Sequence, residues 1–381
     1  MPKGAATGLI LLGLAALDFH LAFGQQTKPA FVREFKWPSP PGSTFPEGEW
    51  EKVKSPLTAD YSSTKLEALR VWLKTQHTTG MLVVVSGRVL FEYGDVAQVS
   101  KIASVRKSVL GMLLGNYVAS GKINLQKTVK ELGLDDLEKF VPIEERATLQ
   151  NLMMSRSGVY FEDDSNAPRK GSRAPGSYFY YNNWDFNAAG TAFEKLTGRN
   201  IYDAMETDLA RPIGMQDYDR AKQKKIQTVP EHLISVHPEY AMYLSTRDMA
   251  RLGLLMLRQG KWKDVDVLPK NWVDYLTTVH TSAAETGLTP ITGPSRWGYG
   301  ALWWVWDAPR GTTSANWSEF TGSYTAMGTD GQYITVIPLY DMVVAHKNAN
   351  IDQTPDRDVS ALQYQTILQM LLDAHCDGGC R

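Results

Sequence analysis

Ser104-Val105-Arg106-Lys107 opens an apolar, helix-like run, and Tyr181-Asn182-Asn183 follows it further along the chain. Residues three apart on a helix share a face, so we expect Lys107 to lie beside Ser104. A serine hydroxyl is a weak nucleophile unless a base lies within hydrogen-bond reach. The free N–H groups at the start of a helix also favour developing negative charge. The stretch therefore predicts an activated serine at a helix start.

A second Ser-x-x-Lys step, Ser62-Ser63-Thr64-Lys65, opens another helix-like stretch, residues 66–76. Its position differs from that of the first. Ser104 comes after a hairpin pattern and before a Tyr-x-Asn element, whereas Ser62 precedes the first predicted strand. We therefore interpret Ser62 as an ordinary N-cap and Ser104 as the candidate nucleophile.

The predicted elements place strands near both ends of the chain and helices between them. Strands are expected at 81–85 and 89–93 around the turn Ser86-Gly87, and again at 299–306, 323–328, 332–337 and 342–346. Helices are expected from Ser104 to about 119, over 184–196, from a capping box of Ser245 and Asp248 to about 260, and from Thr354-Pro355 to about 372.

This order predicts an α/β (α+β) fold with one antiparallel sheet built from both ends of the chain, flanked by helices, and an all-helical insertion lobe. The sheet domain would comprise 60–121 and 286–381, the helical lobe 122–285, and an extended lead-in 25–59. A doubly wound parallel sheet would need regular strand–helix alternation, which the sequence lacks.

Composition excludes some classes of protein. The 381 residues are 43% apolar and carry 40 basic against 41 acidic side chains. This balance gives no reason to expect nucleic acid as a partner. No stretch after the N-terminal segment is long and apolar enough to span a bilayer. No oligomeric state follows from the sequence.

The N-terminus has the pattern of a signal peptide over residues 1–24. Lys3 gives a short positive region, Ala5 to Ala16 is apolar, and Ala22-Phe23-Gly24 is an acceptable cleavage site. The polar residues Asp18 and His20 depart from the pattern, and the alternative is a buried N-terminal helix. We expect export to the periplasm or the medium.

The cysteines are Cys376 and Cys380, in a glycine-containing tail. Export would allow them to form a small disulfide loop. A zinc site would need more ligands than these two thiols and His375, so we expect no metal.

Four segments together resemble the serine β-lactamase and penicillin-binding-protein superfamily, and are most similar to class C-type esterases and 6-aminohexanoate-oligomer hydrolases. They are SVRKS at 104–108, LMMSRSGVYF at 152–161, PGSYFYYNNWDFNAAG at 175–190 and STRDMARLGLLML at 245–257. The similarity runs in order from about residue 80 to about 372. It implies a sheet covered by helices, a helical second lobe and a cleft between them.

The resemblance implies roles for the two first motifs. Ser104 would attack an ester or amide carbonyl, with Lys107 and Tyr181 as a coupled acid/base pair. Which of the two carries the proton stays open. Asn183 would orient the lysine or bind a substrate carbonyl. The reading Tyr180-Tyr181-Asn182 also fits, and the alignment with Pro175-Gly176 favours Tyr181-Asn182-Asn183.

The third motif, usually Lys-Thr-Gly or His-Thr-Gly, departs from the family pattern. The alignment places Ala326-Met327-Gly328 there, with Gly328 against the substrate and the N–H of Thr329 joining that of Ser104 in an oxyanion hole. In an alternative register, Thr329-Asp330-Gly331 is the motif, the donor moves to Gln332, and Asp330 lies beside an amine-bearing substrate.

We therefore expect a serine hydrolase without cofactor that cleaves small carboxylic esters or linear amides. The missing cation of the third motif argues against a β-lactamase or D-Ala-D-Ala carboxypeptidase, which stays an alternative. A non-catalytic binding protein is the other alternative. The sequence has no Gly-x-Ser-x-Gly or His-Glu-x-x-His motif, and His237 and His346 are interpreted as hydrogen-bonded structural residues.

Overall fold

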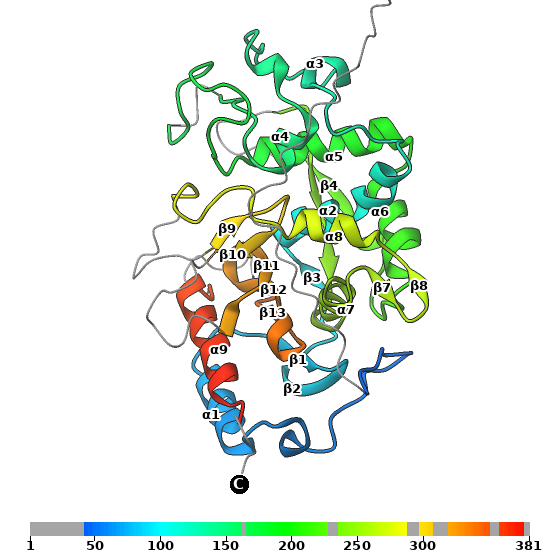
Figure 1. The fold of residues 1–381 in the computed structure, drawn as a ribbon, viewed down its shortest axis with the longest axis vertical. Coiled ribbons are helices and arrows are strands. Elements are labelled where there is room, and N and C mark those ends of the chain that lie inside the picture. Colours follow the sequence, from blue (N-terminus) through cyan, green and yellow to red (C-terminus); the bar gives the residue numbers. More distant parts are fainter. Residues whose placement is uncertain are drawn as a thin grey trace, which may run out of the picture. The chain divides into compact units, whose positions relative to one another are not determined.

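The computed structural model describes residues 42–161, 165–227, 235–287, 297–307, 319–350 and 358–376. The predicted signal peptide and Cys380 lie outside these residues. A seven-stranded antiparallel sheet, in the order β2-β1-β13-β12-β11-β10-β9, forms the centre of the described chain (Figure 1). Its strands are β1 (Gly80–Val85), β2 (Arg88–Gly94), β9 (Trp297–Tyr299), β10 (Trp304–Trp306), β11 (Tyr324–Gly328), β12 (Gln332–Ile337) and β13 (Met342–Lys347).

Strands from opposite ends of the sequence meet in the middle of this sheet. β1 pairs with β13 in a register that runs from Gly80 opposite Lys347 to Val85 opposite Met342. The prediction of one sheet built from both ends of the chain is therefore confirmed.

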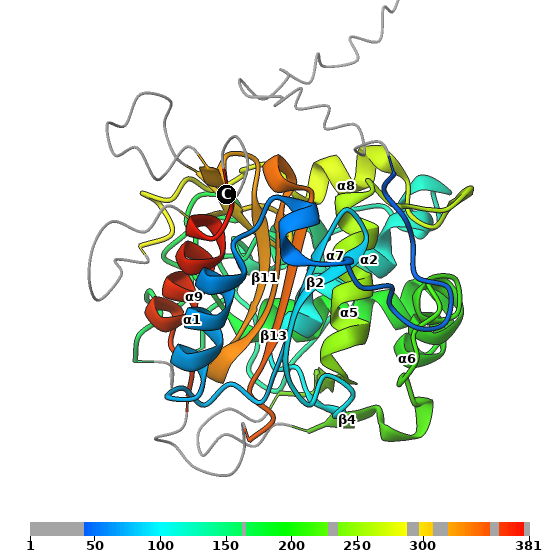
Figure 2. The same cartoon turned by 90° about the horizontal axis from the view of Figure 1, so that it is seen from below.

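The alternation of side chains along β1 explains why both faces of the sheet are covered. Met81 and Val83 belong to the apolar cluster that includes α1 (Ser63–Leu73) and α9 (Ala361–Asp373). Leu82 and Val84 belong to the cluster on the other face, with α2 (Val105–Ala119) and α7 (Thr246–Leu257). Figure 2 shows α1 and α9 side by side on one face, with α2 and α7 on the other.

Helix α7 falls within the range assigned to the helical lobe, yet it packs on β1, β12 and β13. The approach is close because a glycine lies at the contact. A Cβ added to Gly253 would come within 2.4 Å of Val343 and 2.9 Å of Ile334. A larger residue at this position would push the helix off the sheet.

The segment between the two groups of strands is mainly helical and holds short ladders as well. Its helices include α3 (Val129–Leu132), α4 (Leu149–Met153), α5 (Asn183–Thr197), α6 (Ile201–Ala204) and α8 (Lys270–Leu276). Its ladders pair β4 (Lys224–Ile226) with β5 (Glu239–Ala241) and β7 (Lys261–Trp262) with β8 (Val265–Asp266). A further ladder joins β3 (Ser100–Lys101), just before Ser104, to β6 (Tyr243–Leu244), just before α7.

The bounds of three predicted elements differ from those in the structure. The helix-like stretch expected over 66–76 is α1 (Ser63–Leu73), because Ser62 caps it three residues earlier. The strand expected over 299–306 is two strands, β9 and β10, because the backbone N–H groups of Ala301 and Leu302 donate to carbonyls of Leu276 and Met153 instead of to a neighbouring strand. Thr354 and Pro355, where the last helix was expected to begin, lie outside the described residues. Helix α9 begins at Ala361, where Ser360 forms a capping box with Gln363.

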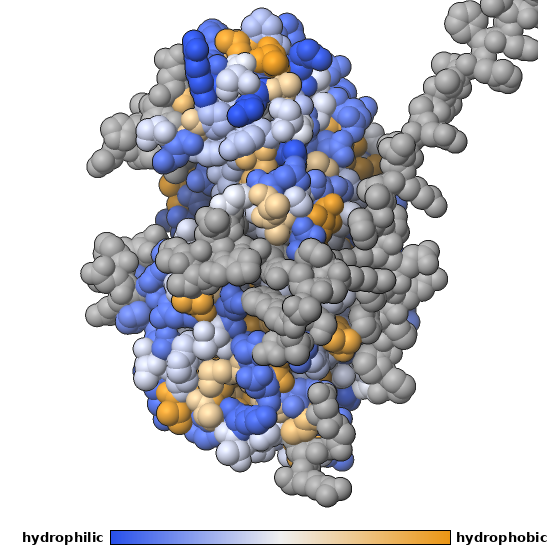
Figure 3. Space-filling model, turned by 60° about the vertical axis from the view of Figure 1, so that its left-hand side comes forward, coloured by the Kyte–Doolittle hydropathy of each residue, from blue (hydrophilic) through white to orange (hydrophobic). Residues whose placement is uncertain are grey.

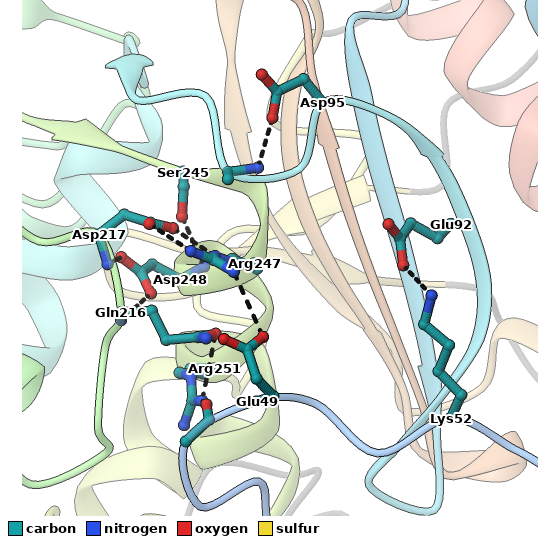
Figure 4. Close-up of polar contacts among 12 residues, drawn as sticks. Glu49, Lys52, Glu92, Asp95, Gln216, Asp217, Ser245, Arg247, Asp248 and Arg251 are labelled. Atoms are coloured by element: carbon teal, nitrogen blue, oxygen red, sulfur yellow. Dashed lines mark hydrogen bonds and ion pairs between the residues drawn. The ribbon is translucent and has the colours of Figure 1, made fainter.

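The capping box predicted for α7 is only half present. Ser245 Oγ accepts from the Asp248 N–H at 3.1 Å, as an N-cap does. The Asp248 carboxylate instead accepts from the backbone N–H groups of Gln216 (2.7 Å) and Asp217 (2.9 Å) (Figure 4). Burial raises the pKa of Asp248 to about 6. Because Arg247 pairs with Asp217, this network joins the start of α7 to the 216–217 segment.

Large exposed apolar side chains are scattered over the described surface. In the view of Figure 3, apolar residues lie in small groups among polar ones. The large ones that are exposed are Leu57, Val71, Leu137, Tyr178, Val236, Val265, Leu339 and Leu362. Single exposed residues of this kind are ordinary on a protein surface. Within the described residues, no helix has the length and hydrophobicity needed to span a membrane.

Candidate active site

Ser104 lies on a tight turn that leads from β3 into α2. The preceding residue, Ala103, has φ 44°, a left-handed conformation that is strained for a residue with a side chain. The N–H groups of Val105, Arg106 and Lys107 then donate to the carbonyls three residues earlier, at 3.1, 3.2 and 3.0 Å. The turn places Ser104, half-buried, at the N-cap of α2.

The two Ser-x-x-Lys steps differ in how their side chains are used. Ser62 Oγ caps α1 by accepting from the Lys65 N–H, and Lys65 Nζ bonds the Asp373 carbonyl at the surface. The interpretation of Ser62 as an N-cap is thus confirmed. Within the described residues, Ser104 Oγ makes no capping hydrogen bond. Its hydroxyl is therefore available for chemistry.

Lys107 is held in the interior by polar and aromatic neighbours. The side chain is 2% exposed. Its Nζ lies 3.0 Å from the Tyr181 hydroxyl and 2.7 Å from Asn183 Oδ1. Nζ also lies 4.3 Å from the centre of the Tyr181 ring and 4.4 Å from that of Phe186. The structure thus brings together the side chains predicted from the first two motifs.

The surroundings shift the pKa values of the two candidate bases in opposite directions. Burial lowers the pKa of Lys107 well below its usual value, and the neighbouring Arg106 cation lowers it further, while Glu239 opposes them. Burial raises the pKa of Tyr181 to about 12, against the opposing effects of a hydrogen bond with Ser104 and of the Arg106 charge. These directions favour a neutral amine beside a neutral phenol.

A serine of the second quoted segment holds the tyrosine loop in place. Ser155, 1% exposed, donates from Oγ to the Tyr180 carbonyl at 2.7 Å and accepts from the Asn182 N–H at 3.0 Å. Asn182 is the N-cap of α5, and its side chain accepts from the Trp184 N–H. Because Asn182 is occupied as a cap, it is Asn183 that reaches the lysine.

The aromatic residues around Tyr181 fix the orientation of its ring. Trp304 stacks on it with ring centres 5.5 Å apart, and Phe186 and Tyr299 contact it at 5.0 and 6.1 Å. Trp304 is 7% exposed. The tryptophan therefore belongs to the wall behind the tyrosine.

The end of strand β11 lies directly against the Ser104 turn. A Cβ added to Gly328 would come within 2.8 Å of the Ile102 carbonyl oxygen and 3.1 Å of the Ser104 backbone nitrogen. Gly328 has an extended backbone, φ −126° and ψ 152°, which any residue can adopt. Glycine is required here because there is no room for a Cβ atom. Thr329 follows at once in the chain, and its part in an oxyanion hole stays a prediction.

The two proposed registers of the third motif differ in which atoms surround their glycine. Gly328 meets the Ser104 turn, whereas a Cβ on Gly331 would meet Val359 and Asn348. This geometry favours Ala326-Met327-Gly328 as the motif. Asp330 lies in the next turn with φ 63°, and its role as a substrate-binding residue stays a prediction.

His346 supports the turn that follows Gly328. The buried His346 ring lies 2.7 Å from the Gly331 carbonyl through Nδ1 and 2.8 Å from Thr78 Oγ1 through Nε2. Burial lowers its pKa to about 4, so the ring is neutral near pH 7. Nδ1–H then donates to the carbonyl and Nε2 accepts from the threonine hydroxyl. The interpretation of His346 as a hydrogen-bonded structural residue is confirmed, but its place beside the third motif was not foreseen.

Gly328→Ala tests whether the close approach matters. We expect kcat/KM for an ester to fall by about 10²–10³-fold, because the new methyl group must displace the backbone of the Ser104 turn and its N–H donor. The Tm should fall by a few degrees at most, since the change lies at the end of a strand. Gly48→Ala, at an exposed glycine with no atom within 4 Å of an added Cβ and no left-handed φ, is the control. An alanine variant at Gly328 with wild-type kinetics would contradict this reading of the site.

The described residues contain no group of three or more His, Cys, Asp or Glu side chains placed to hold a metal ion. Cys376 is disulfide-bonded, and the only other cysteine of the sequence is Cys380.

Comparison with known proteins adds an independent observation. The model of the beta-lactamase family matches residues 71–365 of the chain, which is more than half of it. A candidate 6-aminohexanoate-dimer hydrolase from Bacillus anthracis is 19% identical, with a TM-score of 0.58 over 86% of this chain and 87% of that one. A candidate beta-lactamase from Bacteroides dorei is 18% identical, with a TM-score of 0.58 over 82% and 99%. EstCE1, a hydrolase with promiscuous acyltransferase activity, is 14% identical, with a TM-score of 0.56 over 83% and 98%. At these identities the solved structures show the fold.

Proposed function

This chain belongs to the beta-lactamase family of serine hydrolases, and on that premise we propose that it cleaves carboxylic esters or small linear amides through an acyl-enzyme on Ser104. The observation that carries the proposal is the buried Lys107 Nζ, on the same helix start as Ser104, which contacts the Tyr181 hydroxyl at 3.0 Å and Asn183 Oδ1 at 2.7 Å. The second Ser-x-x-Lys step has no such contact, since Lys65 bonds a surface carbonyl.

The proposed acylation needs a base that can take a proton near neutral pH. As Ser104 Oγ bonds to the substrate carbonyl carbon, its proton passes to the Tyr181–Lys107 pair, and the carbonyl electrons move onto oxygen. A lowered pKa at Lys107 and a raised one at Tyr181 favour the lysine as the group that finally holds the proton, with the phenol as relay.

The proton held by the pair then passes to the leaving group, which completes acylation. When the tetrahedral intermediate collapses, the leaving alcohol or amine takes the proton from Lys107. Water then attacks the acyl-enzyme carbonyl and gives a proton to the same pair, and the pair returns that proton to Ser104 Oγ as the acid is released. The backbone N–H groups of Ser104 and Thr329 would hold the developing oxyanion in both halves.

The third motif supports the choice of substrate class. Strand β11 ends in Ala326-Met327-Gly328, so it carries no cation to bind the carboxylate of a β-lactam. Asp330 follows on the adjoining turn and would repel such a carboxylate. An uncharged or amine-bearing acyl compound is the better match to these residues.

Intact-protein mass after exposure to a fluorophosphonate tests the proposal, with peptide mapping of the adduct. We expect one adduct, on Ser104, followed by turnover of a p-nitrophenyl ester or of a linear 6-aminohexanoate amide in preference to a cephalosporin. An adduct on Ser62 would mean that the wrong step was chosen. A folded protein without any adduct would favour the non-catalytic binding protein, and faster cephalosporin opening would favour a β-lactamase.

A further inference from the structure

Two neighbouring cations of α2 face the same stretch of α5. Lys107 Nζ lies over the Phe186 ring, and Arg106 Nη2 donates to Asn187 Oδ1 at 2.8 Å. Both side chains are buried, with Arg106 5% exposed. A guanidinium keeps its charge in any protein interior, so a permanent positive charge lies next to the amine that would serve as base.

The counter-ion of Arg106 comes from a different element. Glu239 of β5 lies with Oε1 3.5 Å from Arg106 Nε and 3.5 Å from Lys101 Nζ. Its side chain is 15% exposed, so water screens it only in part. One carboxylate is thus shared between two cations, and its charge does not fully compensate that of the guanidinium.

Few other described charges lie close to the Lys107 amine. The hydrogen-bond partners of Nζ, Tyr181 and Asn183, are not carboxylates. Asp185 of α5 is buried too, but Ser157 holds it through a hydrogen bond of 2.6 Å, and burial raises its pKa well above the usual value. The charged groups that act on Lys107 are therefore Arg106 from its own helix and Glu239 from β5.

We propose that Arg106 and Glu239 are positioning residues that act through Lys107: the guanidinium keeps the proton off the amine, and the carboxylate limits the strength of that effect. The inference rests on the proposed function, in which neutral Lys107 takes the Ser104 proton. Burial alone would disfavour a charged amine. The charges of Arg106 and Glu239 set how strongly protonation of the Lys107 amine is disfavoured. They therefore set the lowest pH at which the enzyme is active.

The two residues must act with opposite sign. Removing the positive charge of Arg106 makes protonation of Lys107 easier, so the acid limb of kcat/KM against pH moves to higher pH. Removing the negative charge of Glu239 makes protonation harder, so the limb moves to lower pH. We expect each shift to be about one pH unit, which is a tenfold change in rate at a fixed pH on the limb.

The experiment measures kcat/KM for a p-nitrophenyl ester from pH 4 to 9 in the full chain. The variants are Arg106→Gln, Glu239→Gln and the double variant, whose limb should lie between those of the single variants. Glu194→Gln is the matched control, since Glu194 is also largely buried, 20% exposed, and pairs with a cation, Lys225.

The outcomes separate this inference from the proposed function. Opposite shifts in the two single variants support it, and rate losses without a shift of the limb would overturn it and leave a structural role. If Arg106→Gln does not fold, the downward shift in Glu239→Gln still decides. A wild-type chain that forms no fluorophosphonate adduct on Ser104 would reject the proposed function itself, whereas a normal adduct with unmoved limbs rejects this inference alone.

Discussion

Ser104→Ala is expected to abolish turnover, with a loss of about 10⁴-fold or more in kcat and no fluorophosphonate adduct. Alanine removes the one atom that would attack the substrate. It should change the Tm little, because Ser104 Oγ makes no capping hydrogen bond within the described residues. Ester hydrolysis and thermal unfolding of the same preparation measure both effects.

The second Ser-x-x-Lys step provides the control for this variant. Ser62→Ala should keep full activity and lose about 1 kcal/mol of stability, because Ser62 Oγ caps α1. The two variants should therefore have opposite effects: Ser104→Ala loses activity but not stability, and Ser62→Ala loses stability but not activity. A Ser104→Ala protein with a near-normal rate would remove the basis for the acyl-enzyme.

Lys107→Met is expected to lower kcat/KM by about 10²–10⁴-fold, since it keeps an unbranched buried side chain but removes the base. The Tm should not fall, because methionine avoids the cost of burying an amine. Tyr181→Phe should also lower the rate by orders of magnitude, since it removes the hydroxyl between Ser104 and Lys107. Stopped-flow acylation with a p-nitrophenyl ester, followed by a thermal melt, measures these effects.

Lys65→Met is the control for the lysine variant, because Lys65 bonds only a surface carbonyl at the end of α9. Should Tyr181→Phe keep most of the wild-type rate while Lys107→Met loses it, the phenol would not be a relay, and Lys107 would take the proton directly. Wild-type acylation in Lys107→Met would instead contradict the assigned base.

The central sheet and the contact of Lys107 with Tyr181 and Asn183 could be predicted from the sequence, because they follow from local patterns and one recognisable set of motifs. Apolar, β-rich runs on either side of Ser86-Gly87 and after Ser323 predicted the strands that pair in the structure. Spacing on a helix placed Lys107 beside Ser104, and the motif order supplied Tyr181.

Other features could not be predicted, because they depend on contacts between distant segments. Nothing near Glu239 marks it as the partner of Arg106, since only the folded chain brings β5 to the start of α2. His346 sits in an apolar strand, and its bond to the Gly331 carbonyl requires the register of β12 and β13. The full capping box predicted at the start of α7 is absent for the same reason, because the Asp248 carboxylate accepts from the distant N–H groups of Gln216 and Asp217.

The pairing of β1 with β13 has a consequence for the synthesis of the protein. The Ser104 turn comes from the first third of the chain, but its neighbour Gly328 and the strand that completes the centre of the sheet emerge near the end. Contacts so distant in sequence form slowly and only after most of the chain is available. A nascent or truncated chain therefore holds Ser104, the proposed nucleophile, without Gly328 beside it. We therefore expect hydrolytic activity only in chains in which β11 and β13 have joined the sheet.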